Sequence, residues 1–254
     1  MSTSHYAALL FSYSVALLAM FGIARRAPQL WPAPESPAFA RPWRELAWAL
    51  VAAVAVVAIG MLYSRGWLLP ATSRHRPALD AVNQVLIYAP FPLLLVVRRQ
   101  GAETAWLPRR GILSRVTVGL GLAFLALAAY AVARTGIAGW PRLVAEVYAP
   151  AHVSSFVQVL LEDVSIAILF VRFRGALGPR WTLVLVAVLF AAAHVPGMLA
   201  AGAGAGALWH LVGDVGLGVL ALALLQRLRD VWWFWMVHFA LDMTQFFVVN
   251  RSGP

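Results

Sequence analysis

The sequence SSFVQVLLEDVSIAILFVRFR, residues 154–174, decides the fold of this chain. The stretch has the ~20 apolar residues that a helix needs to cross a bilayer, yet two acids, Glu162 and Asp163, stand near its middle. A carboxyl group at that depth is costly, so it marks a pathway or a reaction centre. Other polar residues recur with Glu162 at helical spacing: Ser154 or Ser155, Gln158 and Ser165. We expect this face to look into a helix bundle and not toward lipid.

Composition places the whole chain among polytopic helical membrane proteins. Its 254 residues are 62% hydrophobic and 12% charged, with a mean hydropathy of +0.78, whereas a soluble domain of this size needs more polar surface. All twenty basic residues are arginines that lie between apolar segments, so we expect the lipid bilayer as partner and no nucleic acid. Since the chain contains no Cys, it can form no disulfide, thiolate nucleophile or Cys-based metal site.

Eight apolar segments predict an all-α bundle of about eight transmembrane helices in a single domain, residues 1–254. The segments are residues 6–23, 46–64, 79–97, 113–134, 152–171, 181–199, 206–225 and 231–249. The third segment contains Pro90 and Pro92, so we expect it to be broken or re-entrant. Residues 28–42 and 135–151 are expected to be loops.

Arginines are distributed unequally between alternate loops. Fourteen follow the first, third, fifth and seventh segments, with Arg115 near the start of the fourth segment counted among them, whereas six lie in the other loops and the C-terminal tail. By the positive-inside rule both termini then face outward. We expect an integral multi-pass protein of a bacterial inner (cytoplasmic) membrane. The first segment is followed by Arg25 and Arg26 and preceded by no basic residue, which is opposite to a cleavable signal peptide.

Chemically active side chains gather in the second half of the chain. Apart from Asp80 near an end, the first four segments contain no acid or histidine expected to be buried. The last four contain Glu162, Asp163, His194, His210, Asp214, His238 and Asp242. We therefore expect residues 1–135 to be scaffold and gate helices and residues 152–249 to carry the chemistry. With a helical rise of ~1.5 Å per residue and alternating helix directions, the residues at 162, 194 and 238 fall within about 5 Å of one another in depth.

The order of these residues resembles the three motifs of the CPBP intramembrane proteases. That family of CAAX proteases and bacteriocin-processing enzymes includes the type II CAAX prenyl endopeptidases, and its patterns are EExxxR, FxxxH and HxxxN or HxxxD. The corresponding residues here are Glu162 with Asp163, Phe190-Ala-Ala-Ala-His194 and His238-Phe-Ala-Leu-Asp242. The resemblance covers about residues 155–245, and the family's eight-helix arrangement agrees with the number of apolar segments.

The resemblance implies a membrane-embedded glutamic protease without a cofactor, whose substrate is a membrane-associated protein or peptide. Glu162 would be the general base that activates water, and His194 would help to hold that water. His238 and Asp242 would face the oxyanion that develops on the scissile carbonyl. Such chemistry needs no thiol or serine nucleophile, and donors in a dry site stabilise an oxyanion strongly. Phe190 is expected to pack beside these groups.

Two positions depart from the family pattern: Ala167 stands where the first motif has its arginine, and Asp163 stands where it has its second glutamate. Arg172 lies too far along the helix to replace that arginine, as does Arg174. Asp163 is therefore expected to be protonated or paired with His210. The residue at position 242 is an aspartate, which donates a hydrogen bond to an oxyanion only when it is protonated.

Two other classes of function stay open from the sequence. Glu162, His194, His238 and Asp242 are also competent zinc ligands, which would give a zinc-dependent membrane hydrolase. Ala167 favours instead a non-catalytic membrane partner or immunity-type factor with the same fold. A proton-coupled transporter is disfavoured, because the acids are confined to one half and no inverted repeat is visible.

Overall fold

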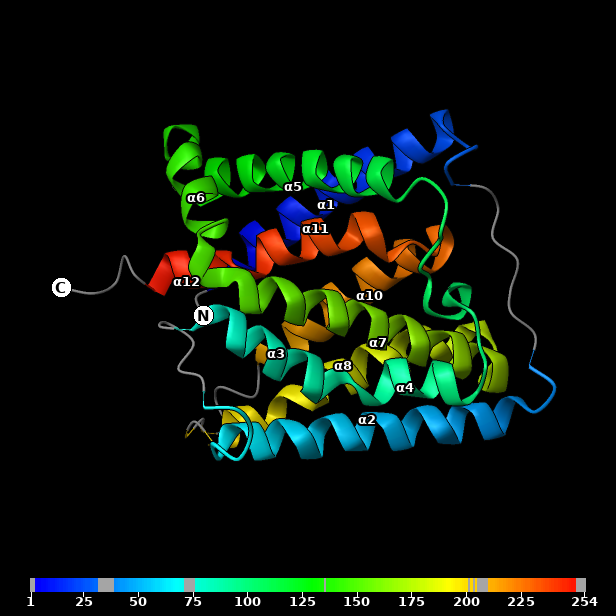
Figure 1. Ribbon diagram of the computed structural model, residues 1–254. Helices are drawn as coiled ribbons and strands as arrows, with labels where there is room; N and C mark the ends of the chain where they lie inside the picture. Colours follow the sequence, from blue (N-terminus) through cyan, green and yellow to red (C-terminus); the bar gives the residue numbers. More distant parts are fainter. Residues whose placement is uncertain are drawn as a thin grey trace.

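The computed structural model describes residues 3–31, 39–70, 76–134, 136–200 and 210–249, together with Gly202 and Gly204 (Figure 1). All regular structure in these ranges is helical, which confirms the all-α prediction. The helices are α1 (Thr3–Arg26), α2 (Pro42–Ser64), α3 (Pro77–Tyr88), α4 (Pro90–Val97), α5 (Ile112–Arg134), α6 (Trp140–Val147), α7 (Val153–Leu177), α8 (Pro179–Ala200), α10 (His210–Leu228), α11 (Val231–Asp242) and α12 (Thr244–Val249). Short 3-10 helices are η1 (Ala102–Ala105), η2 (Ile137–Gly139) and η3 (Pro150–His152).

Several of these helices are suited to crossing a membrane. Within the described residues, five are long and apolar enough, namely α1, α2, α5, α7 with η3, and α10, and α3 with α4 makes a sixth if the bent pair is one span. The apolar part of α8 is shorter, at Trp181–Pro196, and α11 has only 12 residues. These helices indicate a multi-pass membrane protein, while eight crossings stay a prediction.

Two of the predicted segments are interrupted. The third bends by 49° between α3 and α4, as expected from its prolines. Pro90 has no N–H to continue the helix and opens a new one at its first position. The last segment, predicted as one helix over 231–249, divides at Met243 into α11 and α12.

The predicted loop 135–151 was wrong in part, because it contains the short helix α6. Leu143 and Val147, four residues apart, are buried. Arg142 and Glu146 point outward and form an exposed ion pair at 2.9 Å. This two-faced pattern is sufficient for an amphipathic helix packed on α5 and α12.

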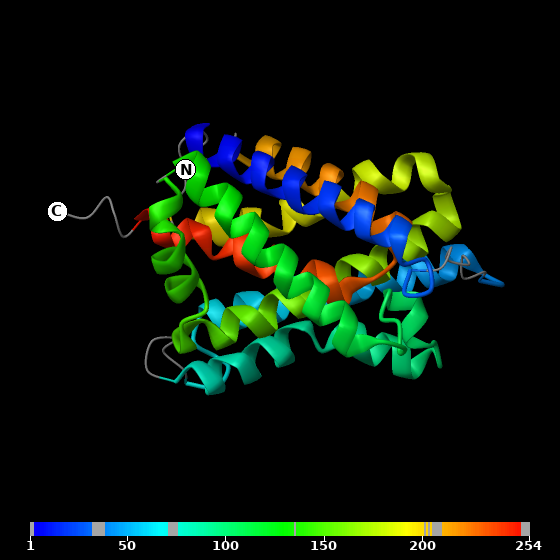
Figure 2. The ribbon, with the colours of Figure 1, turned by 90° about the horizontal axis from the view of Figure 1, so that it is seen from above.

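The long helices run side by side, with α5 and α2 at opposite sides of the bundle (Figures 1 and 2). Helices α7 and α11 lie between them, and α11 packs on both α5 and α7. The contact of α5 with α11 depends on Gly119, since a Cβ atom there would lie 2.6 Å from the Cα and carbonyl O of Trp233. Close approach of helices at small residues is typical of membrane bundles.

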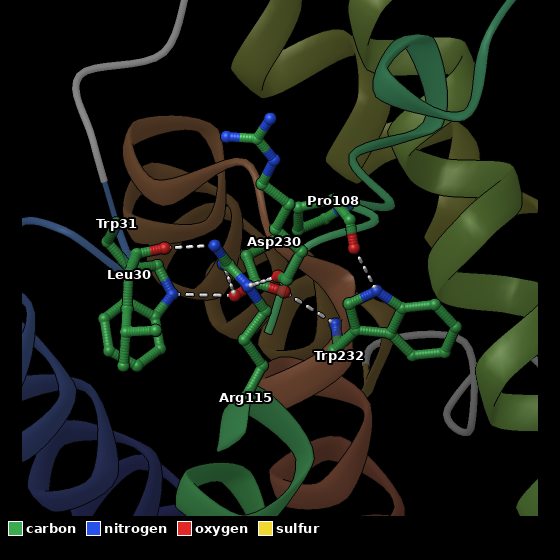
Figure 3. A network of polar contacts seen from close by, with 7 residues as sticks. Leu30, Trp31, Pro108, Arg115, Asp230 and Trp232 are labelled. Carbon is green, nitrogen blue, oxygen red and sulfur yellow. Dashed lines mark hydrogen bonds and ion pairs between the residues drawn. The ribbon is translucent and has the colours of Figure 1, made fainter. Parts of the chain in front are cut away.

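A buried polar network fixes the start of α11 (Figure 3). Asp230 accepts hydrogen bonds from Arg115 Nη1 at 2.6 Å, from Trp31 Nε1 at 2.7 Å and from the Trp232 amide at 3.0 Å. Arg115 also donates to the Leu30 carbonyl. Burial raises the pKa of Asp230, whereas the ion pair with Arg115 opposes that rise. The network therefore joins the loop after α1, the first turn of α5 and the first turn of α11.

One histidine and one glutamate of the first half are buried, which the sequence did not indicate. His5 is 1% exposed and Glu45 is 5% exposed, and each lies one residue outside a predicted apolar segment. Glu45 accepts hydrogen bonds from Arg98 Nη2 at 2.6 Å and Gln100 Nε2 at 2.7 Å. The fully buried Arg172 donates hydrogen bonds to Gln100 and to the Thr104 carbonyl, so its guanidinium holds the loop after α4 against α7.

Candidate functional site

A cavity of about 340 Å³ lies between α1, α7, α8, α10, α11 and α12. All four predicted catalytic residues line it, one of them from α7, one from α8 and two from α11: Glu162, His194, His238 and Asp242. Phe190 of α8 lines it as well. The structure therefore brings the side chains of all three sequence motifs to one space.

Glu162 is held through one of its two carboxylate oxygens. Its Oε1 accepts a hydrogen bond from Tyr88 Oη at 2.8 Å and another from Gln158 Nε2 at 2.8 Å. Gln158 comes from the preceding turn of α7, whereas Tyr88 comes from the end of α3. Because both donors contact the same oxygen, Oε2 is the atom left for the cavity.

The contact of Tyr88 with Glu162 belongs to a regular pairing of α3 with α7. Ser154 donates to Asp80, and these two residues are 74 positions apart in sequence. Tyr88 and Glu162 are also 74 positions apart. Asp80 and Tyr88 are eight residues apart, so they lie two turns apart on one face of α3. Tyr63 of α2 also donates to Asp80. Tyr88 was not predicted, although its position just before Pro90, two turns after Asp80, is the signal that could have found it.

His238 pairs with Asp163. Its Nδ1 lies 2.8 Å from Asp163 Oδ1, and Asp163 is fully buried. The expectation that Asp163 is protonated or paired with His210 stays a prediction, because the His210 side chain lies outside the described residues. Because a carboxylate can only accept, Nδ1 carries the proton and the ring presents Nε2 as its other nitrogen. Asp163 Oδ2 has no partner in the described part of the chain.

His194 is exposed and is oriented by its own helix. Its Nδ1 lies 2.9 Å from the Phe190 carbonyl oxygen, one turn earlier, so Nδ1 is the donor and Nε2 of the neutral ring holds a lone pair. The Phe190 ring lies edge-on between the two histidine rings, with centroids 4.9 Å from His194 and 6.4 Å from His238. Helix α8 continues through Pro196.

Asp242 and α1 complete the wall of the cavity. Asp242 Oδ1 accepts a hydrogen bond from Gln245 Nε2 of α12 at 3.0 Å. Helix α1 contributes His5, Tyr6 and Tyr13, none of which the sequence indicated as part of a site. His5 precedes the first apolar segment. His5 Nδ1 lies 2.8 Å from Tyr130 Oη of α5. The first half of the chain therefore supplies part of the cavity wall as well as scaffold.

The same side chains do not form a metal site in this arrangement. Over the ranges that the structure describes, no three His, Asp or Glu side chains are placed to hold a metal ion together. The four residues that could ligate zinc thus line one cavity, but no three of them are placed to bind the same metal ion.

Comparison of the chain with protein-family models, with curated proteins and with solved structures found no match.

Proposed function

We propose that this protein is an intramembrane endopeptidase of the CPBP type, which hydrolyses a peptide bond of a membrane-associated protein or peptide. In this proposal the chain crosses the membrane eight times, with broken third and last passes. The observation that carries the proposal is the cavity lined jointly by Glu162, His194 and His238, each from a different helix.

Water attack on the scissile carbonyl starts at Glu162. Its Oε2 takes a proton from a water molecule while Tyr88 and Gln158 hold Oε1, so the carboxylate keeps one orientation. The lone pair on His194 Nε2 accepts the second proton of that water as a hydrogen bond. The oxygen of the activated water then bonds to the carbonyl carbon, and Glu162 returns the proton to the leaving amine as the C–N bond breaks.

The oxyanion of the intermediate is stabilised by α11. Beside the carboxylate of Asp163, the His238 ring can carry a second proton, and its Nε2–H then donates to the oxyanion. Asp163 acts through His238 by fixing the ring's orientation, as carboxylates do for histidines in many active sites. Asp242 adds a second donor only in its protonated form.

The proposal predicts that Glu162→Gln lowers cleavage by at least ~100-fold, since a positioned general base contributes roughly that much or more. Folding and membrane insertion should persist, because the amide keeps an oxygen for Tyr88. The measurement compares new N-termini by mass spectrometry in membranes of cells that express the wild type, Glu162→Gln, or the control Glu146→Gln on exposed α6.

Peptides that appear with the wild type and with the control, but not with Glu162→Gln, would identify substrates. Cleavage by Glu162→Gln at near wild-type rate would remove the residue from the mechanism. Cleavage of an identified peptide by purified, chelator-treated, metal-free protein separates the alternatives: full loss of activity there would favour the zinc hydrolase. Full biological function without any cleavage would favour the non-catalytic partner.

A further inference from the structure

Two arginines from different helices contact one aromatic ring at the arginine-rich end of the bundle. The guanidinium carbon of Arg25 lies 4.0 Å from the ring centroid of Phe21, and that of Arg227 lies 5.1 Å from it. The two guanidinium carbons are therefore at most the sum of these distances, about 9 Å, apart. Arg25 stands in the last turn of α1 and Arg227 in the last turn of α10, and these helices pack against each other.

These two positive charges are not neutralised within the described part of the protein. Arginines that form ion pairs there include Arg98, Arg115 and Arg142, with Glu45, Asp230 and Glu146. Arg25 and Arg227 are both exposed and have no carboxylate within ion-pair distance in the same ranges. A pair of like charges gathered on one ring is stabilised by a bound anion, and guanidinium groups match phosphate oxygens in geometry.

The position of the pair indicates a lipid as the source of that anion. The candidate membrane spans His5–Arg26 and Leu211–Leu228 both end at this point, which places the guanidinium groups at headgroup depth. Phe11, Leu18 and Arg25 recur at intervals of seven residues and share one face of α1. Phe11 is 48% exposed and Leu18 is 71% exposed. The exposed apolar side chains on this face of α1 thus lie next to the two arginines. A phospholipid has the same order of groups, with an apolar acyl chain next to a charged phosphate.

We propose that Arg25, Phe21 and Arg227 form a specific site for the phosphate of an anionic phospholipid, whose acyl chain lies along Leu18 and Phe11. The site is separate from the cavity of Glu162 and does not depend on the proposed protease activity. Basic sites between helices on the arginine-rich side of a membrane protein are suited to such headgroups.

The experiment titrates the purified full-length protein in detergent with dioleoylphosphatidylglycerol and measures bound lipid by native mass spectrometry. We expect Arg25→Gln and Arg227→Gln each to weaken binding about fivefold, and the double variant about 25-fold, from the usual contribution of one arginine near an anionic surface. Arg44→Gln is the matched control, because it removes one exposed charge at the same end of the bundle, at the start of α2. It should change binding less than twofold.

Three outcomes would overturn the proposal. Equal losses in Arg44→Gln and the two site variants would show that only overall charge matters. Equal binding of dioleoylphosphatidylcholine would show that the anion is not recognised. Full competition by millimolar inorganic phosphate would show a phosphate site without lipid specificity. Arg25→Lys and Arg227→Lys, which keep the charge, provide a second test if a glutamine variant unfolds, and we expect them to retain binding within about threefold.

Discussion

At the scale of single residues, the carboxylate of Glu162 is the most constrained acid of the cavity. One oxygen accepts two hydrogen bonds, from Tyr88 and Gln158, and the other is left for the cavity. The His238 ring is constrained in a similar way, with Nδ1 bonded to Asp163 and Nε2 left for the cavity. Each of these two side chains thus presents one defined atom, and the proposed hydrolysis depends on such preorganisation.

Tyr88→Phe should lower kcat/KM by about 10- to 150-fold, because a hydrogen bond to a charged group contributes ~1.5–3 kcal/mol. Without it, only Gln158 orients the carboxylate. The measurement is the cleavage rate of a substrate found by the comparison of new N-termini. Tyr63→Phe is the matched control, since it removes a tyrosine hydroxyl bonded to Asp80 at the other end of the same pairing. If both variants cleave equally well, Tyr88 does not act through Glu162.

At the scale of elements, α11 is positioned by its contacts with α5 and by the network around Asp230. The α5 contact is close because Gly119 has no side chain. The network is buried, so the charges of Arg115 and Asp230 compensate each other. Since α11 carries His238 and Asp242, both features act on the geometry of the cavity.

Gly119→Ala should destabilise the protein by ~1–3 kcal/mol, the usual cost of an inserted methyl group in a packed interface. The new Cβ would meet the backbone of Trp233 at 2.6 Å, so α11 would have to move. Gly121→Ala, two residues further along and on the opposite face of the same helix, has no atom within 4 Å of its new Cβ and should change little. Thermal unfolding in detergent measures both. Equal midpoints for the two variants would contradict the close contact of α5 with α11.

Arg115→Met should destabilise the protein by ~3–5 kcal/mol, because it leaves the buried carboxylate of Asp230 without its guanidinium. Arg142→Met is the control, since its exposed pair with Glu146 is worth at most ~1 kcal/mol. Thermal unfolding again measures the difference. Adding Asp230→Asn to Arg115→Met removes the uncompensated charge and should recover part of the loss. No recovery would show that the charge of Asp230 is not the cause.

At the scale of the whole molecule, the arrangement of the helices gives the bundle two unlike ends. The turns after α1, α4, α7 and α10 lie at one end (Figure 1), and the fourteen arginines counted in the sequence lie in these turns or in the helix ends next to them. The first turns of α1 and the helix α12 lie at the opposite end. This polarity agrees with an arginine-rich cytoplasmic side.

Cysteine labelling tests this orientation, since the chain has no Cys of its own. Arg109→Cys and Ala138→Cys are exposed positions on either side of α5. In intact cells, a membrane-impermeant maleimide should label Ala138→Cys and should label Arg109→Cys only after permeabilisation. The reverse pattern would invert the orientation, and equal labelling of both in intact cells would show that α5 does not cross the membrane.

The sequence by itself determined the helical membrane class, the break at Pro90 and the grouping of Glu162, His194 and His238, which share the cavity. These follow from apolarity and helical spacing, which are local properties of the chain. It did not determine that Asp163 pairs with His238, that Tyr88 holds Glu162, or that His5 and Glu45 are buried. Those partners lie far apart in sequence, 75 residues for Asp163 with His238, and only the packing of α3, α7 and α11 brings them together. The tertiary structure therefore decided the partners of the acids, because partner choice depends on the register of one helix against another.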